Sequence, residues 1–422
     1  MAPGRAQRAA VLLTLLLPAA RAWAQEPSPP PAVEDTQEAG EASTEPPARR
    51  LVKWNEYEGP LFTLRASAGV ILDAGTFAQD EASREQLDLE PDGQVRDFRV
   101  MLNGRIKTKR AITWCAGFMY DGSSKEWFVR QTGLMIAVPE LKGHLFIGRS
   151  KEGISLSMVM VGYAGFTMER SPAVVAMVPL LADGIKWMGH LPKQHLLFNL
   201  GWYTDVLSEG QSFSSYDNQF VARVGWLPIL EEEGKLLHVA IAGRYGTVND
   251  DTLRLRSRPE VNVAPYFVDT ETFAAHDTRL MQGEVYYRPG SWLFGTEYFV
   301  QRVNARDVPD PLFHGGDALA SWLITGEKRR YNTAGGYFLA VSPRRPVTQG
   351  GPGALEAVLK LTYTDLDDGA IHGGRFWRLT PMLNWYLTDH LRLEAAYGVG
   401  QLDRFGTTGT TQFFQSRLQF QF

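Results

Sequence analysis

The chain has 422 residues, a formal net charge of −4 and a single cysteine. It lacks the strong positive charge of a nucleic-acid-binding protein, and Cys115 alone can form neither an intrachain disulfide nor a cysteine-based zinc site. Residues 51–422 contain no apolar run near the ~18 residues that a membrane-spanning helix needs, so we expect no such helix.

The N-terminal region carries export signals. Two arginines precede an apolar stretch and a small-residue site that ends at Ala24. This order is typical of a secretory signal peptide, so we expect residues 1–24 to be removed by cleavage after about Ala24. Residues 25–50 are rich in Pro, Glu and Ala, which predicts a disordered periplasmic linker. An exported chain without disulfides fits the envelope of a Gram-negative bacterium. Residues 51–422 are then expected to form the folded domain.

Strand-like segments then recur to the end of the chain. Apolar and polar residues alternate within them, which predicts strands with one apolar and one polar face. The expected strands are 61–70, 94–107, 111–120, 126–138, 141–150, 184–190, 194–204, 217–226, 235–246, 279–288, 291–302, 318–325, 354–364, 375–386, 390–400 and 411–422. The longest connections are 151–183, 247–278, 303–317 and 343–353. About sixteen strands, an even number, predict an all-β fold: a closed transmembrane antiparallel β-barrel with long extracellular loops and short periplasmic turns.

The last segment tests this prediction. Phe414, Leu418, Phe420 and Phe422 share one parity, and glutamines and Arg417 share the other. By itself the pattern fits either an edge strand of a soluble sandwich or the closing strand of a membrane barrel, apolar toward lipid and polar toward a wet lumen.

The barrel hypothesis fixes where cations point. In 98–109, the apolar parity is expected to face lipid, which turns Arg99, Arg105, Lys107 and Lys109 into the lumen. The opposite register would place them in hydrocarbon, at about 2–4 kcal/mol for each cation near the midplane.

The same sorting turns Arg223 and Arg244 inward. Arg254, Arg256 and Arg258 alternate and share one face if their segment is extended. Aligned guanidinium groups in a narrow channel raise the local anion concentration and can bind oxyanions in bidentate fashion. The alternative is that mixed charges only keep the lumen wall wet, and that the Arg254 row is an exposed loop.

No catalytic or metal-binding pattern is visible in the sequence. The eight histidines lack metal-ligand spacing, and neither a nucleophile elbow nor a P-loop is present. We therefore expect no catalytic residue, no metal and no cofactor.

Five segments, in order, resemble motifs of the phosphate- and pyrophosphate-selective porin family. They are Gly148–Ser157, Phe166–Ser171, Ser321–Tyr331, 355–374 and Leu383–Thr388. The resemblance implies a homotrimer of sixteen-stranded barrels, each with its own channel, arginine ladder, lysine cluster and central anion site. It also implies that the loop 151–183, with Glu169 and Arg170, folds inward, and that the barrel-assembly machinery reads Phe422.

This chain departs from the family pattern in three places. Arg149-Ser150 stands for Gln-Phe, Gly153-Ile154 stands for Pro-Phe, and Phe98–Met101 stands where relatives have a denser arginine run. These departures bear on the phosphate preference more than on the fold.

The sequence thus predicts a non-enzymatic outer-membrane channel for passive diffusion of anions, with phosphate or related oxyanions as solutes. The expected pore-lining residues are Arg99, Arg105, Lys107, Lys109, Arg149, Lys151, Arg170, Arg223, Arg244, Arg254 and Arg256. The alternatives are a general porin without anion selectivity and an outer-membrane enzyme or adhesive barrel. The expected partners are inorganic anions, outer-membrane lipid and two further copies of the chain, with no nucleic acid.

Overall fold

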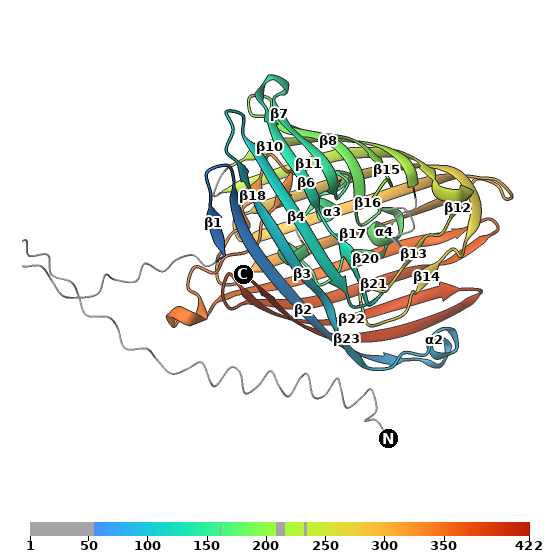
Figure 1. Ribbon diagram of the computed structural model, residues 1–422. Helices are drawn as coiled ribbons and strands as arrows, with labels where there is room; N and C mark the ends of the chain where they lie inside the picture. The colour runs from blue at the N-terminus through green and yellow to red at the C-terminus, as the bar shows by residue number, and fades with distance from the viewer. Residues whose placement is uncertain (1–54, 161, 208–215, 232–233) are drawn as a thin grey trace, which may run out of the picture.

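The computed structural model shows a barrel of long tilted strands around an interior that holds short helices and hairpins (Figure 1). It describes residues 55–160, 162–207, 216–231 and 234–422. The expected signal peptide (1–24) and linker (25–50) lie outside the described residues.

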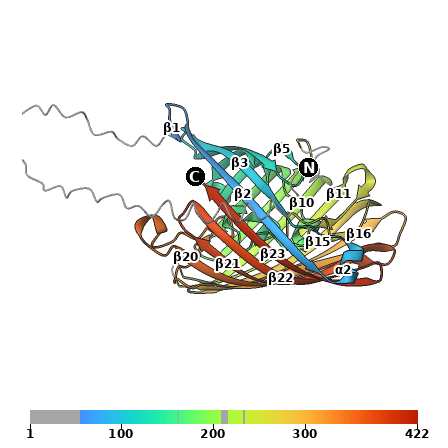
Figure 2. The ribbon, with the colours of Figure 1, turned by 90° about the horizontal axis from the view of Figure 1, so that it is seen from below.

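The barrel closes between its first and last long strands. β2 (Thr63–Gln79) pairs antiparallel with β23 (Thr407–Gln421), from Gly69 opposite Gln421 to Gln79 opposite Thr411. Figure 2 shows these two strands side by side. Because β23 pairs with β22 on its other side, the chain ends in a closing strand and not in the edge strand of a soluble sandwich.

Sixteen strand positions form the wall, which confirms the predicted closed antiparallel barrel. After β2, the wall strands are β3 (Asp92–Ile106), β4 (Ile112–Asp121), β5 (Glu126–Val129) with β6 (Thr132–Val138), β7 (Gly143–Ser150), β8 (Ala182–Leu191), β9 (Leu196–Thr204), β10 (Tyr216–Leu230), β11 (Lys235–Val248), β15 (Phe273–Pro289), β16 (Trp292–Ala305), β17 (Leu312–Leu323), β20 (Ala354–Asp368), β21 (Ile371–Tyr386), β22 (Leu391–Arg404) and β23. Each one overlaps a strand expected from the alternation, but the bounds differ: β2 runs to Gln79 and not to 70, and β17 begins at Leu312 and not at 318.

One wall position is interrupted. β5 and β6 both pair with β4, and the break between them contains Arg130 and Gln131. A bulge of this kind re-aims side chains, because the strict in-and-out alternation stops there.

The two ends of the barrel differ. The turn end carries Phe422 and short connections such as 107–111 and 192–195, while the loop end carries the long connections 151–181 and 249–272. In outer-membrane barrels short turns are periplasmic and longer loops extracellular. One connection breaks the expected rule, because 324–353 is long although it lies at the turn end.

Three segments fold into the lumen. We call 151–181 the constriction loop; it holds α3 (Leu156–Val159) and α4 (Pro172–Met177). We call 249–272 the hairpin loop and 324–353 the inward turn. The remaining short elements are β1 (Glu56–Glu58), α2 (Glu81–Gln86), β12 (Thr252–Leu253), β13 (Arg256–Ser257), β14 (Val268–Asp269), β18 (Tyr331–Asn332) and β19 (Tyr337–Phe338).

These segments give the lumen a hydrophobic core. Phe267 of the hairpin loop lies 5.3 Å from Phe376 of β21 and 5.8 Å from Phe413 of β23, measured between ring centroids. All three side chains are buried. Apolar residues at lumen-facing positions are therefore explained by the segments that pack on them.

Within the described residues, no helix is long and apolar enough to cross a membrane.

Candidate functional site

The wall strands sort their side chains as the alternation predicts. On β10, Phe220, Val224 and Trp226 are exposed on the outer face, whereas Arg223 is 1% exposed on the lumen side. On β23, Phe414 and Phe420 are exposed and Arg417 is buried. The outer face is apolar because it contacts lipid, and the cations line the interior.

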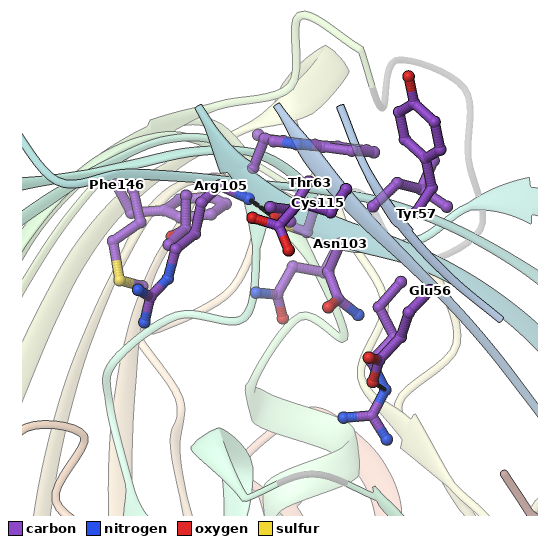
Figure 3. Close-up of a pocket in the computed structure, with 16 residues that line it drawn as sticks. Glu56, Tyr57, Thr63, Asn103, Arg105, Cys115 and Phe146 are labelled. Atoms are coloured by element: carbon purple, nitrogen blue, oxygen red, sulfur yellow. Dashed lines mark hydrogen bonds and ion pairs between the residues drawn. The ribbon is translucent and has the colours of Figure 1, made fainter. Parts of the chain in front are cut away.

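A vestibule opens at the turn end of the barrel. Figure 3 shows side chains from β1 to β4 and from β7 around this cavity of about 630 Å³. Its cations are Arg65 and Arg105, and Arg65 lies 3.9 Å from a carboxylate oxygen of Glu56. Uncharged groups such as Asn103 complete the lining. The cavity is therefore wet and of mixed charge.

The two predicted lysines of this region lie at the rim. The Lys107 ammonium is 3.0 Å from Glu58, and Lys109 is exposed in the turn between β3 and β4. Both can attract anions from the periplasm, but neither lines the vestibule as Arg105 does.

Deeper in the barrel the structure gathers five cations, which we call the central cluster: Arg99, Arg130, Lys151, Arg170 and Lys186. Lys151 and Arg170 donate to the same carbonyl, that of Met160, at 2.5 and 3.3 Å. Lys186 donates to the Lys151 carbonyl at 3.1 Å. The constriction loop thus presents its backbone oxygens to cations from the wall and from its own sequence.

Two further contacts bound the central cluster. The Arg99 guanidinium lies 4.5 Å from the ring centroid of Tyr163. The Lys186 ammonium lies 5.2 Å from the ring of Phe146, which also lines the vestibule. The cluster therefore stands at the inner end of the vestibule and shares a wall with it.

The central cluster has few counter-charges. Within the described part of the chain, Arg99 pairs with Asp97 at 2.5 Å, and no carboxylate forms an ion pair with the other four cations. The neighbouring Glu169 already pairs with Arg96 and Arg417 at 2.9 and 2.5 Å. Buried charge without a partner is unfavourable, so this cluster favours the entry of an anion.

The pKa values of two cations of the constriction loop reflect this shortage of counter-charges. Burial, reinforced by Arg170, Arg130 and the other two cations of the cluster, lowers the pKa of the Lys151 ammonium well below its usual range. Burial likewise lowers the pKa of Arg170 to about 10, although Glu169 opposes the shift. A bound anion would restore the charged forms.

Carboxylates on the opposite wall hold the constriction loop in place. The amide nitrogens of Leu156 and Ser157 donate to Glu284 and Glu297 at 2.8 and 2.7 Å, and the Ser157 hydroxyl donates to Glu297 at 2.6 Å. Ser155 caps α3 by accepting from the Met158 amide. Negative charge at the first turn suits exposed amide donors.

Three predicted arginines are instead paired with carboxylates. Arg149 holds Asp183 at 2.7 Å, Arg244 lies 3.5 Å from Glu152, and Arg223 donates to Glu284 through two nitrogens, one of them at 2.9 Å. All three arginines are buried. They lie in the interior as predicted, but their charge is largely neutralised.

Two of these arginines, and Arg378 of β21, also clamp a folded-in segment. Arg223 donates to the Gly336 carbonyl of the inward turn at 3.0 Å, and Arg244 donates to the Met177 carbonyl of the constriction loop at 2.7 Å. Arg378 donates to the Pro259 carbonyl of the hairpin loop at 2.5 Å. A guanidinium can do this because its five donors serve a carboxylate and a carbonyl together.

The predicted arginine row lies on the hairpin loop at the loop end. Arg254 binds both oxygens of Asp269, at 2.8 and 2.6 Å. Arg256 and Arg258 stack on Tyr266, at 4.2 and 4.7 Å from its ring centroid. The row is therefore an inward-folded hairpin and not an exposed loop, and with Arg170 it borders a cavity of about 240 Å³.

Two members of the central cluster, Lys186 and Arg130, are not among the residues predicted from the sequence. Lys186 follows Ile185, which is 41% exposed on the outer face, so the same parity argument could have found it. Arg130 lies at the break between β5 and β6, where alternation gives no direction. No metal-binding group of three or more ligands occurs among the residues described.

Solved outer-membrane barrels share this fold. The OmpT outer membrane protein of Vibrio cholerae superposes with a TM-score of 0.56 and 11% identity, over 87% of this chain and 99% of that one. OmpF of Salmonella typhi gives 0.55 and 9%, over 87% and 100%. An anion-selective porin from Comamonas acidovorans gives 0.50 and 10%, over 85% and 100%.

Sequence comparison is more specific. An uncharacterized protein of Caulobacter vibrioides is 30% identical over 176 residues. The match covers 41% of this chain and only 35% of the length of that relative. The family model for phosphate-selective porin O and P matches residues 125–422, from β5 to the C-terminal end, with the central cluster's Arg130, Lys151, Arg170 and Lys186 inside the matched region. The barrel fold, the inward constriction loop and this match agree: the chain belongs to the phosphate-selective porin O and P family.

Proposed function

We propose that this protein is a passive outer-membrane channel for anions, with phosphate or related oxyanions as solutes and the central cluster as the binding site. The observation that carries the proposal is the concentration of Arg130, Lys151, Arg170 and Lys186 around the constriction loop, where no described carboxylate forms an ion pair with them. An oxyanion supplies the missing counter-charge and accepts several of the donors.

Cations at three depths support a route through the lumen. Arg105 lines the vestibule, the central cluster follows, and Arg254 and Arg256 border the cavity at the loop end. Such a series lets an anion move between adjacent sites, each strong enough to admit it and weak enough to release it. No step of this function requires catalysis or a cofactor.

We also propose how the chain is exported and assembled. We expect a homotrimer in the outer membrane of a Gram-negative bacterium, exported by a signal peptide cleaved after about Ala24. We also expect the barrel-assembly machinery to read Phe422, which directly follows β23 and continues its apolar parity. Deletion of Phe422 should then lower the amount of heat-modifiable barrel in outer membranes, and unchanged amounts would count against this role.

A general porin without anion selectivity is the second candidate. The neutralised pairs Arg149–Asp183, Arg223–Glu284 and Arg244–Glu152 favour it, because they show that buried arginines here also serve to hold the fold.

Reversal potential in a planar bilayer under a KCl gradient separates the two. The proposal expects an anion-signed potential and block of the chloride current by phosphate. Lys186→Gln should weaken the block by about tenfold, because it removes one cation from the binding site. A tenfold change corresponds to about 1.4 kcal/mol of binding free energy. Lys107→Gln, at the exposed rim, is the control and should leave the block near its wild-type value. A cation-signed or near-zero potential without block would make the protein a general porin.

A further inference from the structure

The outer wall of the barrel carries an apolar hollow near the loop end. It spans β9 to β15, and its volume is about 660 Å³. Trp202, Phe220 and Met281 border it and are 44%, 58% and 62% exposed. These side chains have the outward parity, so the hollow faces the membrane and not the lumen.

Small residues create the hollow. Ala222 lies opposite Gly243 across β10 and β11, and Gly243 lies opposite Met281 across β11 and β15. Gly283, two residues further along the same outward row of β15, has open space where a Cβ would stand. The rows on either side carry large residues such as Phe220 and Ile241. The wall is therefore indented at this place.

Arginine lines the loop-end side of the hollow. Arg279 faces outward on β15, directly opposite Arg302 on β16, and their side chains are 72% and 64% exposed. Like charges directly opposite each other destabilise a sheet, and a lipid-facing arginine is costly. An anion between the two guanidinium groups removes both penalties.

Each arginine of the pair also forms an ion pair with one carboxylate. Asp277 is 3.8 Å from Arg279, and its other oxygen already accepts from Asn304 at 2.7 Å. Asp310 is 3.5 Å from Arg302. Three strands further along the wall, on β21, the outward-facing Arg375 has Asp365 at 3.0 Å.

The position of the arginines fits a lipid headgroup. Tyr245 stands beside Arg279 in the same row, and Tyr298 stands beside Gly283, two positions closer to the membrane centre. Tyrosines mark the interface in outer-membrane barrels. The arginine pair thus lies at headgroup level on the extracellular side, with the apolar hollow beneath it at acyl-chain level.

We propose that the Arg279–Arg302 pair and the hollow over Ala222 and Gly243 form a binding site for the phosphorylated glycolipid of the outer leaflet, lipopolysaccharide. The guanidinium pair takes a lipid phosphate, and one acyl chain occupies the hollow. A phospholipid of the inner leaflet has its phosphate at the other end of the barrel and cannot use this pair.

Binding of purified lipid A to the delipidated protein in detergent tests the site. Arg279→Gln with Arg302→Gln should weaken binding by about tenfold, since two cations near the membrane surface are removed. Gly243→Leu should weaken it too, because it fills the hollow; its Cβ would lie 3.4 Å from the Met281 sulfur, so the backbone accepts a side chain. Arg375→Gln is the matched control and should bind lipid A within about twofold of wild type.

Three further results decide the outcome. Lipid A without phosphate should bind the wild type as weakly as lipid A binds the double arginine variant. Equal competition by phosphatidylglycerol would overturn the assignment to the glycolipid. Unchanged lipid A binding by both the double variant and Gly243→Leu, with an altered oligomeric state, would make this face an interface between copies of the chain.

Heat-modifiable gel migration checks that every variant folds, and unchanged single-channel conductance separates this site from the pore.

Discussion

The two sides of the lumen use cations differently. Around the constriction loop, Arg130, Lys151, Arg170 and Lys186 have no carboxylate partner among the residues described. On the β10, β11 and β15 side, Arg223 and Arg244 are ion-paired and also clamp folded-in segments. The contrast teaches that an inward arginine is not by itself an anion ligand. Its counter-charge decides whether it holds the fold or meets the solute.

The paired side should show the largest effect on stability. Arg223→Gln leaves the buried Glu284 without its arginine partner, with the His238 ring 2.8 Å away. We expect the free energy of unfolding to fall by about 3–5 kcal/mol, because breaking one partner of a buried pair strands the other charge. Urea unfolding of the barrel in lipid vesicles measures this loss. The double variant with Glu284→Gln should recover part of it, and a single variant as stable as wild type would refute the structural role.

A substitution in the central cluster should leave the free energy of unfolding unchanged or raise it, in contrast to Arg223→Gln. Lys151→Gln removes a buried ammonium that has cationic neighbours. We expect the same unfolding measurement to show unchanged or increased stability, while phosphate block of the chloride current weakens by about tenfold. A loss of stability like that of Arg223→Gln would mean that Lys151 serves the fold and would end the contrast between the two sides.

Titration sharpens the contrast further. Because the pKa of Lys151 is lowered in the folded protein, this lysine loses its charge as the pH rises through that lowered pKa, below the range of an ordinary lysine. Sulfate keeps a constant charge there, so its block of the current should weaken with rising pH. The Lys151→Gln channel should show a flatter profile in the range below about pH 10, where an ordinary lysine stays charged. Parallel profiles for the two proteins would assign the titration to another group.

The smallest effect is expected at the loop end. Arg254 is bidentate to Asp269 and lies near Glu271 at 3.1 Å, so its charge is already balanced. Arg254→Gln should change the reversal potential little and the phosphate block by less than about twofold. A shift as large as that of Lys151→Gln would move the selective site from the central cluster to the hairpin loop.

The barrel was predictable because the local alternation of residues determines which face of a strand each side chain occupies. Alternation over a few residues turned Arg99, Arg223 and Arg244 inward, and the structure agrees. The same alternation turns Lys186 inward, although Lys186 is not among the predicted residues. Alternation could not reach Arg130, because the break between β5 and β6 cancels the parity.

The partners of these cations were not predictable. Arg223 and Glu284 are 61 residues apart, and Arg417 and Asp73 are 344 apart. No local pattern relates such positions. Their pairing depends on barrel closure and on which segments fold into the lumen, as does the unexpected inward turn at the periplasmic end.

The sequence by itself thus determined the barrel, its register and which face of each strand meets lipid, because a period-two pattern and the cost of charge in hydrocarbon act residue by residue. Only the tertiary structure decided which inward cations keep their charge for a solute, because neutralisation requires a carboxylate within a few ångströms, and that distance is set by loops folded across the lumen.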